Sequence, residues 1–215
     1  TAQLEEGDKL MRPPTPLRDW SYLDAPLAEK KAWLSGFVWG DGSTQFAHGK
    51  ETGSRVRLCG EKQQFEKRIS DLGFNVTRPD SAEGDPCFQL PGLFKRLPHQ
   101  DASIEELTAF VRGYLDADGT HNMRGDSVNP FTGIQATGEE SINFIRNKFP
   151  VVGAYISSER DCSDEVTNFG PRSDVTARFH IVMGFSSAAV APYIVREVSL
   201  SERVETVWCL EVEED

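Results

Sequence analysis

Two aspartates, Asp41 and Asp118, each stand before a glycine at the end of an apolar segment. The segments are nine residues long, Leu34–Gly42 (LSGFVWGDG) and Val111–Gly119 (VRGYLDADG), and the aspartates hold the same place in both. Carboxylates and backbone carbonyls are the hard oxygen ligands that Mg²⁺ takes in proteins. If the fold brings the two acids together, the chain has ligands for a divalent cation and for the hydrolysis that such a cation supports.

Both acids are expected at the C-terminal end of a helix. Asp24 is a typical N-cap residue, and Pro26 suits the first turn of a helix that contains the first segment. Ser103 and Glu106 have the spacing of a capping box and predict the start of a second helix. Each segment therefore ends a helix, and the glycine after each acid is expected at the left-handed C′ position that stops it.

Small residues should let these two helices pack closely. Gly36 and Gly40 lie four residues apart in the first helix, as do Gly113 and Ala117 in the second. Residues with this spacing share a face, and the lack of a large side chain lets two backbones approach. Helices packed in this way would end at the same level and bring the two acids together.

The acids would then share an unfavourable environment. An acid at a helix C-terminus is disfavoured by about 0.3–1 kcal/mol, because the helix dipole is negative there. Sequence selected for stability alone should avoid placing two acids together at such ends, and a divalent cation resolves the conflict. The expected ligands are two carboxylates and two carbonyls at the helix ends: Asp41, Asp118, Gly40 and Ala117.

The two segments head a longer internal repeat. Asp41 and Asp118 are 77 residues apart, and each is followed by the patterns of two strands and a helix. The expected strands are at 45–47, 55–59 and 131–136, the expected helices at 61–72 and 139–149, and further strand pairs at 75–90 and 151–185. The sequence therefore predicts an α+β domain of two pseudo-symmetric αββαββα units.

Both segments resemble the signature of the LAGLIDADG homing endonucleases. The second segment fits closely, with the following residues in register: Gly113, Leu115, Asp116, Ala117, Asp118 and Gly119. The first segment keeps Leu34, Gly36, Asp41 and Gly42, and has Trp39 where the family pattern usually has an acid. Two copies in one chain make the resemblance more specific than a single match would be.

The resemblance implies a fold and an activity. In this family two curved antiparallel sheets form a saddle on double-stranded DNA, and metal-bound acids cut both strands. A chain with two motif copies acts as a monomeric pseudo-dimer. Carried over to this chain, the resemblance makes Asp41 and Asp118 the essential ligands of Mg²⁺ or Mn²⁺.

The family also carries a basic residue beside the metals in each unit. The resemblance points to Lys95 for the first unit, with Arg96 as a rival, and to Arg196 for the second. Arg196 departs from the usual lysine. Because arginine stays protonated, it can stabilise developing charge but cannot accept a proton.

The two ends of the chain resemble parts of an intein splicing domain. Thr1–Leu10 (TAQLEEGDKL) is similar to an early splicing block, and Val204–Asp215 (VETVWCLEVEED) to a late one. The chain lacks the splice-junction residues of both blocks, so we expect that the chain as given does not splice. The expected division is a splicing-domain flank at 1–23, LAGLIDADG units at 24–102 and 103–200, and a splicing-domain strand at 201–215.

The net charge of −11 opposes DNA binding, because nonspecific affinity comes mainly from phosphate neutralisation. Its distribution weakens this objection. Residues 202–215 hold six acids and one arginine, whereas residues 50–78 hold seven basic residues and four acids. Arg55 and Arg57 alternate along an expected strand and share a face. The candidate DNA-binding residues are all basic: Arg55, Arg57, Lys62, Arg124, Arg172 and Arg178.

Composition fits a globular protein. The chain has 215 residues, 38% of them hydrophobic, and no apolar run of the ~20 residues that a membrane span needs. Its four cysteines lack Cys-x-x-Cys spacing, so neither a zinc site nor a disulfide framework is indicated. We expect a cytoplasmic protein without a membrane partner. Residues 158–176 form a long expected loop in which Gly170-Pro171 marks a turn.

These features predict a homing endonuclease of an intein that makes a metal-dependent double-strand break at the intein insertion site. One alternative is a decayed, inactive nuclease that binds DNA or only supports the splicing domain, and Trp39 favours this reading. Another is an RNA-binding maturase, which the intein-like ends disfavour. Cleavage of DNA in the presence of Mg²⁺ separates the first reading from the others.

Overall fold

The computed structural model describes residues 9–10, 16–79, 84–121, 131–167, 170–172, 174–183 and 193–194. The chain divides into two compact units, one of Thr1–Arg12 with Ser187–Asp215 and the other of Pro13–Ser186. In the first unit, strands β1 (Lys9–Leu10) and β12 (Tyr193–Ile194) pair antiparallel. The strand expected at 201–215 lies outside the described residues. All that follows concerns Pro13–Ser186.

This second unit holds two successive sets of helices and strands. The first set comprises α1 (Pro16–Asp19), α2 (Leu27–Asp41), β2 (Ser43–Ala47), β3 (Lys50–Arg57), η1 (Gly60–Phe65), α3 (Glu66–Ser70), β4 (Val76–Thr77), β5 (Cys87–Leu90) and η2 (Gly92–Phe94). The second comprises α4 (Ile104–Asp118), β6 (Thr120–His121), β7 (Phe131–Thr137), α5 (Glu139–Lys148), η3 (Pro150–Val152), β8 (Ala154–Asp161), β9 (Val166–Thr167), β10 (Gly170–Pro171) and β11 (Thr176–Met183).

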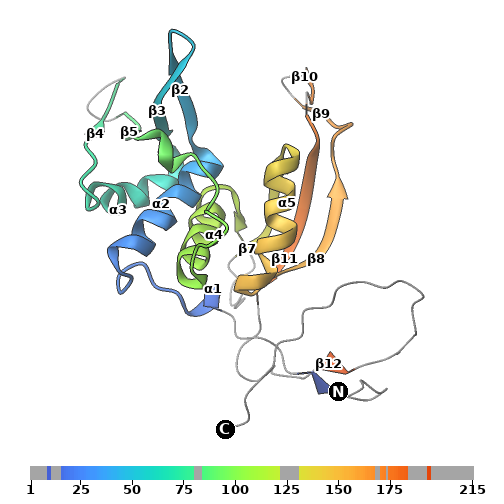
Figure 1. Cartoon of the computed structure of the whole chain (residues 1–215). Helices are drawn as coiled ribbons and strands as arrows, with labels where there is room; N and C mark the ends of the chain where they lie inside the picture. Colours follow the sequence, from blue (N-terminus) through green and yellow to red (C-terminus); the bar gives the residue numbers. More distant parts are fainter. Residues whose placement is uncertain are drawn as a thin grey trace. The chain divides into compact units, whose positions relative to one another are not determined.

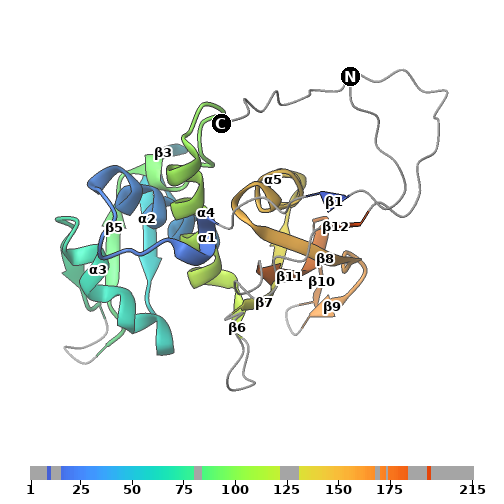
Figure 2. The same ribbon diagram turned by 90° about the horizontal axis from the view of Figure 1, so that it is seen from below.

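The strands form two four-stranded antiparallel sheets, in the orders β2-β3-β5-β4 and β6-β7-β11-β8, and β9 pairs with β10 in a separate hairpin. Helices α2 and α4 lie side by side with one sheet on either side of them (Figures 1 and 2). The α+β class with antiparallel sheets is therefore confirmed. None of the described helices has the length and apolar character needed to cross a membrane.

Helices α2 and α4 contain the two nine-residue segments and are called the motif helices. Their starts differ. At α4 the capping box forms as expected, because Glu106 N donates to Ser103 Oγ at 3.1 Å and Ser103 N donates to Glu106 Oε2 at 3.2 Å. The cap predicted at Asp24 is wrong. Helix α2 begins at Leu27 with Pro26 as its N-cap and no side-chain cap, because Asp24 lies in the preceding turn, too far from the first helical N–H groups.

The two motif helices touch through their backbones. A Cβ atom added at Gly36 would lie 1.9 Å from the carbonyl oxygen of Phe110, and one added at Gly113 would lie 1.9 Å from that of Trp33. The contacts are reciprocal, since each glycine faces a residue three places before the other. Real Cβ atoms do not approach oxygen so closely, so only glycine fits at either position.

The left-handed conformation predicted for the two glycines after the acids is wrong. Gly42 has φ −84° and Gly119 has φ −68°, and both are extended because the chain passes directly from each helix into a strand. Gly42 is required for space instead. A Cβ atom there would lie 2.5 Å from the carbonyl oxygen of Val38, to which the Gly42 N–H also donates at 2.8 Å.

The remaining elements follow the expected order with local changes. The helix expected at 61–72 is divided into η1 and α3. The first set ends in the short η2 instead of a full helix, since Pro91 precedes it and Pro98 follows shortly after. Gly170-Pro171 is not a turn but the strand β10, paired with β9. The last helix expected in the second set falls mostly outside the described residues.

Two hydrophobic cores flank the helix pair. One contains Trp33, Phe37 and Val56 and packs between α2 and the first sheet; the other contains Phe110, Phe144 and Phe179 and serves the second sheet. Each motif helix thus contributes its own core side chains while sharing the glycine contact. The packing fixes the ends of both helices at one place.

We expect Gly113→Ala and Gly36→Ala each to lower the free energy of unfolding by about 1–3 kcal/mol, the usual cost of overpacking. An alanine inside a helix normally stabilises by roughly 0.5–1 kcal/mol relative to glycine, so the sign itself is informative. Urea denaturation measures the change. Ser35→Ala, on the same helix, is the control and should change little. A Gly113→Ala protein as stable as the parent would contradict the backbone contact.

Candidate functional site

The two motif helices bring two carboxylates to adjoining ends. Asp41 is the last residue of α2 and Asp118 the last residue of α4. A Cβ atom at Gly40 would lie 3.0 Å from Asp118 Oδ2 and 2.8 Å from the Cβ atom of Ala117. The Asp118 carboxylate therefore lies against the last turn of α2, beside Asp41, as the sequence predicts.

The charges of this pair are coupled. The pKa of Asp118 is raised above its ordinary value, first by loss of surrounding solvent and then by the negative charge of Asp41. Lys62 and Lys95 act in the opposite direction. The Asp118 side chain still reaches solvent. Its carboxylate is therefore accessible, although its ionised form is disfavoured by its surroundings.

Lys62 lies beside one of the acids. Its Nζ is 2.8 Å from Asp41 Oδ2, and both side chains are partly exposed. The sequence predicts that Lys62 binds DNA. In the structure Lys62 lies on η1, in contact with a candidate metal ligand.

Lys95 lies against the last turns of α2. Its Nζ donates to the carbonyl oxygens of Val38, at 3.1 Å, and Trp39, and it lies 5.4 Å from the centre of the Trp39 ring. Burial lowers the pKa of Lys95, while Asp118 and Asp41 act to raise it.

The rival basic residue, Arg96, turns away and forms a 2.6 Å ion pair with Glu51 on the surface. Of the two rivals, Lys95 rather than Arg96 is therefore the residue that lies near the acids. Arg196 lies outside the described residues.

A hollow opens next to Asp118. Its lining residues come from α2, α4, β7, the start of α5 and the residue after η2: Trp39, Gly40, Lys95, Tyr114, Asp118, Gln135, Ala136, Thr137, Gly138, Glu140 and Ser141. The Tyr114 hydroxyl makes side-chain hydrogen bonds with Ser141 and Trp39, and burial raises its pKa strongly. Sequence reasoning missed Tyr114 and Ser141. The only available signal was a tyrosine at an apolar place of the second motif segment.

The donor set fits a small, hard cation. Asp41 and Asp118 supply carboxylate oxygens, and the last carbonyls of α2 and α4, including those of Gly40 and Ala117, lie at the same ends. Among the described residues no group of three or more acidic, histidine or cysteine side chains could hold a metal. Mg²⁺ commonly takes only one or two carboxylates and keeps several waters, so two acids suffice.

Arg55 and Arg57 lie on one face of β3, since Val56 between them is buried in the core. Arg55 Nε donates to Cys87 Sγ at 2.9 Å, and Arg57 Nε lies 3.3 Å from Asp85 Oδ2. The partner of Arg55 lies on β5 and that of Arg57 just before it, and both guanidinium groups remain partly exposed.

The second sheet carries a comparable polar face. Arg172 and Arg178 both donate to Gln135 Oε1, at 3.4 and 3.2 Å. A hollow on this face runs from Asp118 past Gln135 to Arg178 and His180. Gln135 is a third residue that sequence reasoning missed, because a single glutamine in a strand has no distinctive pattern. Arg124 lies outside the described residues.

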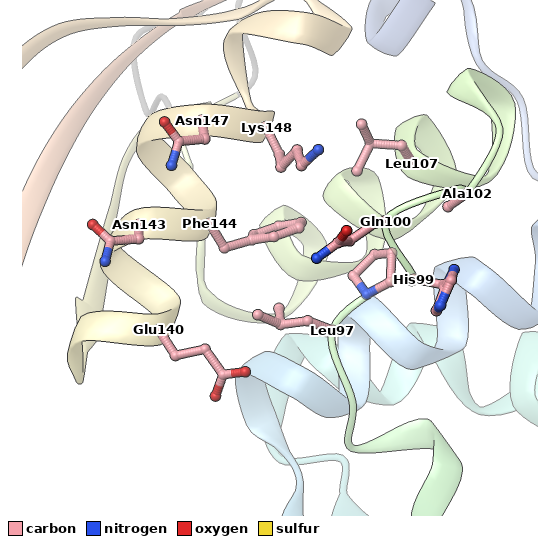
Figure 3. A pocket seen from close by; sticks show the side chains of 11 residues that line it. Leu97, His99, Gln100, Ala102, Leu107, Glu140, Asn143, Phe144, Asn147 and Lys148 are labelled. Atoms are coloured by element: carbon pink, nitrogen blue, oxygen red, sulfur yellow. The ribbon is translucent and has the colours of Figure 1, made fainter.

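A further hollow lies away from the acids, between α5 and the segment that leads into α4. Figure 3 shows Phe144 reaching from α5 toward Leu97 and Gln100. Neither Asp41 nor Asp118 lines it. The surface that lines it is mainly apolar, and none of the site residues predicted from the sequence lines it.

No known protein family and no curated protein matches the sequence. Among solved structures, the chain is similar to the N-terminal LAGLIDADG domain of a DUF199/WhiA protein, with 14% identity and a TM-score of 0.46 over 76% of this chain and 81% of that chain. It is also similar to full-length DUF199/WhiA from Thermatoga maritima, with 12% identity and a TM-score of 0.48 over 77% of this chain and 54% of that chain. Similarity at this level does not assign a function.

We expect Asp118→Asn to melt at or above the parent temperature at pH 7 in EDTA. Because the folded state raises the pKa of Asp118, its ionised form opposes folding above that pKa. The penalty fades as the pH falls toward the ordinary aspartate pKa, so the difference between the proteins should shrink in acid. Thermal melts across pH measure this.

Asp164→Asn, in an exposed turn, is the control and should follow the parent at every pH. Added Mg²⁺ should raise the melting temperature of the parent more than that of Asp118→Asn, because a ligand that binds only the folded state stabilises it. An asparagine variant that melts well below the parent without metal would make Asp118 a structural residue.

Proposed function

We propose that this protein is a LAGLIDADG-type endodeoxyribonuclease, a homing endonuclease that hydrolyses phosphodiester bonds on both strands of a specific site in double-stranded DNA. The observation that carries the proposal is the convergence of Asp41 and Asp118 at adjoining helix ends, with Lys62 and Lys95 beside them. Stability alone does not favour two acids there. The intein-like segments at both ends support an insertion site within a host gene as the target.

The residues near the two helix ends would have different roles in the reaction. Asp41 and Asp118 would hold Mg²⁺ or Mn²⁺, with the carbonyls of Gly40 and Ala117 at the same helix ends. When bound, such an ion activates water and neutralises charge on the phosphate. Lys95 is held by two carbonyls of α2, and its lowered pKa suits proton exchange near neutral pH better than an ordinary lysine.

The exposed faces of the two sheets would hold the DNA. Arg55 and Arg57 on β3, and Arg178 on β11, present guanidinium groups that suit phosphates and guanine edges. The reciprocal contacts of Gly36 and Gly113 support a pseudo-twofold relation of the two sets of elements, with the acids near its axis. This arrangement would straddle a duplex as a saddle and reach both strands.

One observation favours a second candidate, an inactive nuclease that binds DNA or supports a splicing domain. Lys62 already pairs with Asp41 at 2.8 Å, and Lys95 lies close enough to Asp118 to affect its pKa. The two lysines balance the two acids without a metal. Such a protein would bind DNA but leave it intact in Mg²⁺.

Incubation with a pool of randomised duplexes in Mg²⁺, followed by sequencing of cut ends, separates the candidates. We expect cleavage of both strands at a selected site by the parent, and none by Asp41→Asn or Asp118→Asn. Lys67→Met, which removes an exposed charge on α3, is the control and should cut normally. Duplexes that bind the protein but remain intact would favour the second candidate. Normal cutting by both asparagine variants would refute the metal site.

We expect the active protein to be a monomer of 24.0 kDa, because α2 and α4 already supply both halves of the helix contact within one chain. Light scattering on the protein, alone and with a selected duplex, measures the mass. A stable dimer in which the glycine faces of α2 and α4 pair between chains would contradict the intramolecular contact.

A further inference from the structure

Asp116 belongs to the second motif segment, but its carboxylate is committed to partners other than the candidate metal site. The residue is 6% exposed. Trp33 Nε1 donates to its Oδ2 at 2.8 Å, and Arg112 Nε donates to its Oδ1 at 3.3 Å. Arg68 Nη1 lies 3.6 Å from Oδ2. A buried carboxylate is costly unless it is paired, and here it has two cations and an indole N–H.

Arg68 connects this acid to α3. Its guanidinium carbon lies 4.9 Å from the centre of the Tyr22 ring, 5.5 Å from that of Trp33 and 5.1 Å from that of Phe65. The Tyr22 hydroxyl donates to the backbone carbonyl of Arg68 at 2.8 Å. Both the side chain and the backbone of Arg68 are therefore held, the former by Asp116 and three aromatic rings.

The held segment carries Lys62. Helix α3 continues directly from η1, since Phe65 and Glu66 at the junction both have right-handed helical backbone angles. Lys62 lies six residues before Arg68 on this continuous segment. Phe65 and Ile69 bury one face of the segment against the core, and Glu66 pairs with Arg78 at 2.7 Å. The contact of Arg68 with Asp116 ties the segment to α4.

We propose that Asp116 is a positioning residue of the nuclease site, which anchors Arg68 and thereby holds the η1–α3 segment so that Lys62 reaches Asp41. The effect on cleavage rests on the proposed function. The positioning of Lys62 at Asp41 does not. It connects the C-terminal end of α4 to that of α2 through a third helical segment.

Two variants interrupt this connection in different ways. Asp116→Asn keeps the shape and an acceptor for Trp33, but it removes the charge that faces Arg68 and Arg112. Arg68→Met keeps an unbranched apolar stem and leaves Asp116 paired with Arg112 and Trp33, so no uncompensated buried charge remains. Lys67→Met is the matched control, since it removes a lysine charge from the next position of α3, where Lys67 pairs with Asp71 on the surface.

The first measurement is the acetylation rate of each lysine in the folded, metal-free protein, followed by mass spectrometry. We expect Lys62 to react several-fold faster in Asp116→Asn and Arg68→Met than in the parent, and at the parental rate in Lys67→Met. Lys95 is the reference for folding because its Nζ is held by the carbonyl oxygens of Val38 and Trp39 in the folded protein. If Lys95 also becomes reactive in Asp116→Asn, that variant is unfolded, and Arg68→Met decides.

The second measurement is single-turnover cleavage of a selected duplex, with DNA affinity measured separately. We expect the cleavage rate constant of Arg68→Met to fall by about tenfold to a hundredfold, the factor that corresponds to one lost charged hydrogen bond, with DNA affinity unchanged. The double variant Arg68→Met with Lys62→Met should cut no more slowly than Lys62→Met alone, because both changes remove the same contact between Lys62 and Asp41.

Parental Lys62 reactivity in both folded variants would overturn the proposal. So would equal increases in Arg68→Met and Lys67→Met, since these would mean general loosening of α3. If Lys62 becomes reactive as expected but the parent cuts no duplex, the positioning role stands and the proposed function fails.

Discussion

The backbone contact between α2 and α4 is the constraint on which the candidate site depends. At Gly36 and Gly113 a carbonyl oxygen of the opposite helix occupies the space where a Cβ atom would stand. Because the two helices meet at equivalent positions, their last residues, Asp41 and Asp118, arrive at the same place. Any side chain at the crossing would separate the helices and, with them, the acids. The contact also determines where the two sheets lie, since each sheet packs on its own motif helix.

This contact creates an electrostatic conflict, and the chain handles its acids in different ways. Asp41 pairs with Lys62 at the surface. Asp118 reaches solvent with a raised pKa and has Lys95 nearby. Asp116, only two residues earlier, is buried and fully engaged by Trp33, Arg112 and Arg68. Asp116 thus has the most paired neighbours of the three acids, whereas Asp41 and Asp118 each have a lysine nearby.

Trp39 and Asp116 differ in chemistry although they come from similar nine-residue segments. They hold corresponding places in the two segments, and each faces a cation: the Trp39 ring lies over Lys95, and the Asp116 carboxylate lies beside Arg68. The first of these positions thus provides a cation–π contact, and the second provides an ionic contact.

The sequence by itself determined the local features: the capping box at Ser103, the helix ends at Asp41 and Asp118, the alternation of Arg55 and Arg57, and the order of elements after each motif segment. These follow from hydrogen bonds and periodicities within a few residues. The extended backbone at Gly42, the position of Lys62 beside Asp41 and the choice of Lys95 over Arg96 were decided only in three dimensions. So were the partners of Asp116. Each depends on contacts between residues far apart in the chain, and a charge pattern along the sequence does not specify which opposite charge the folded chain will bring within reach.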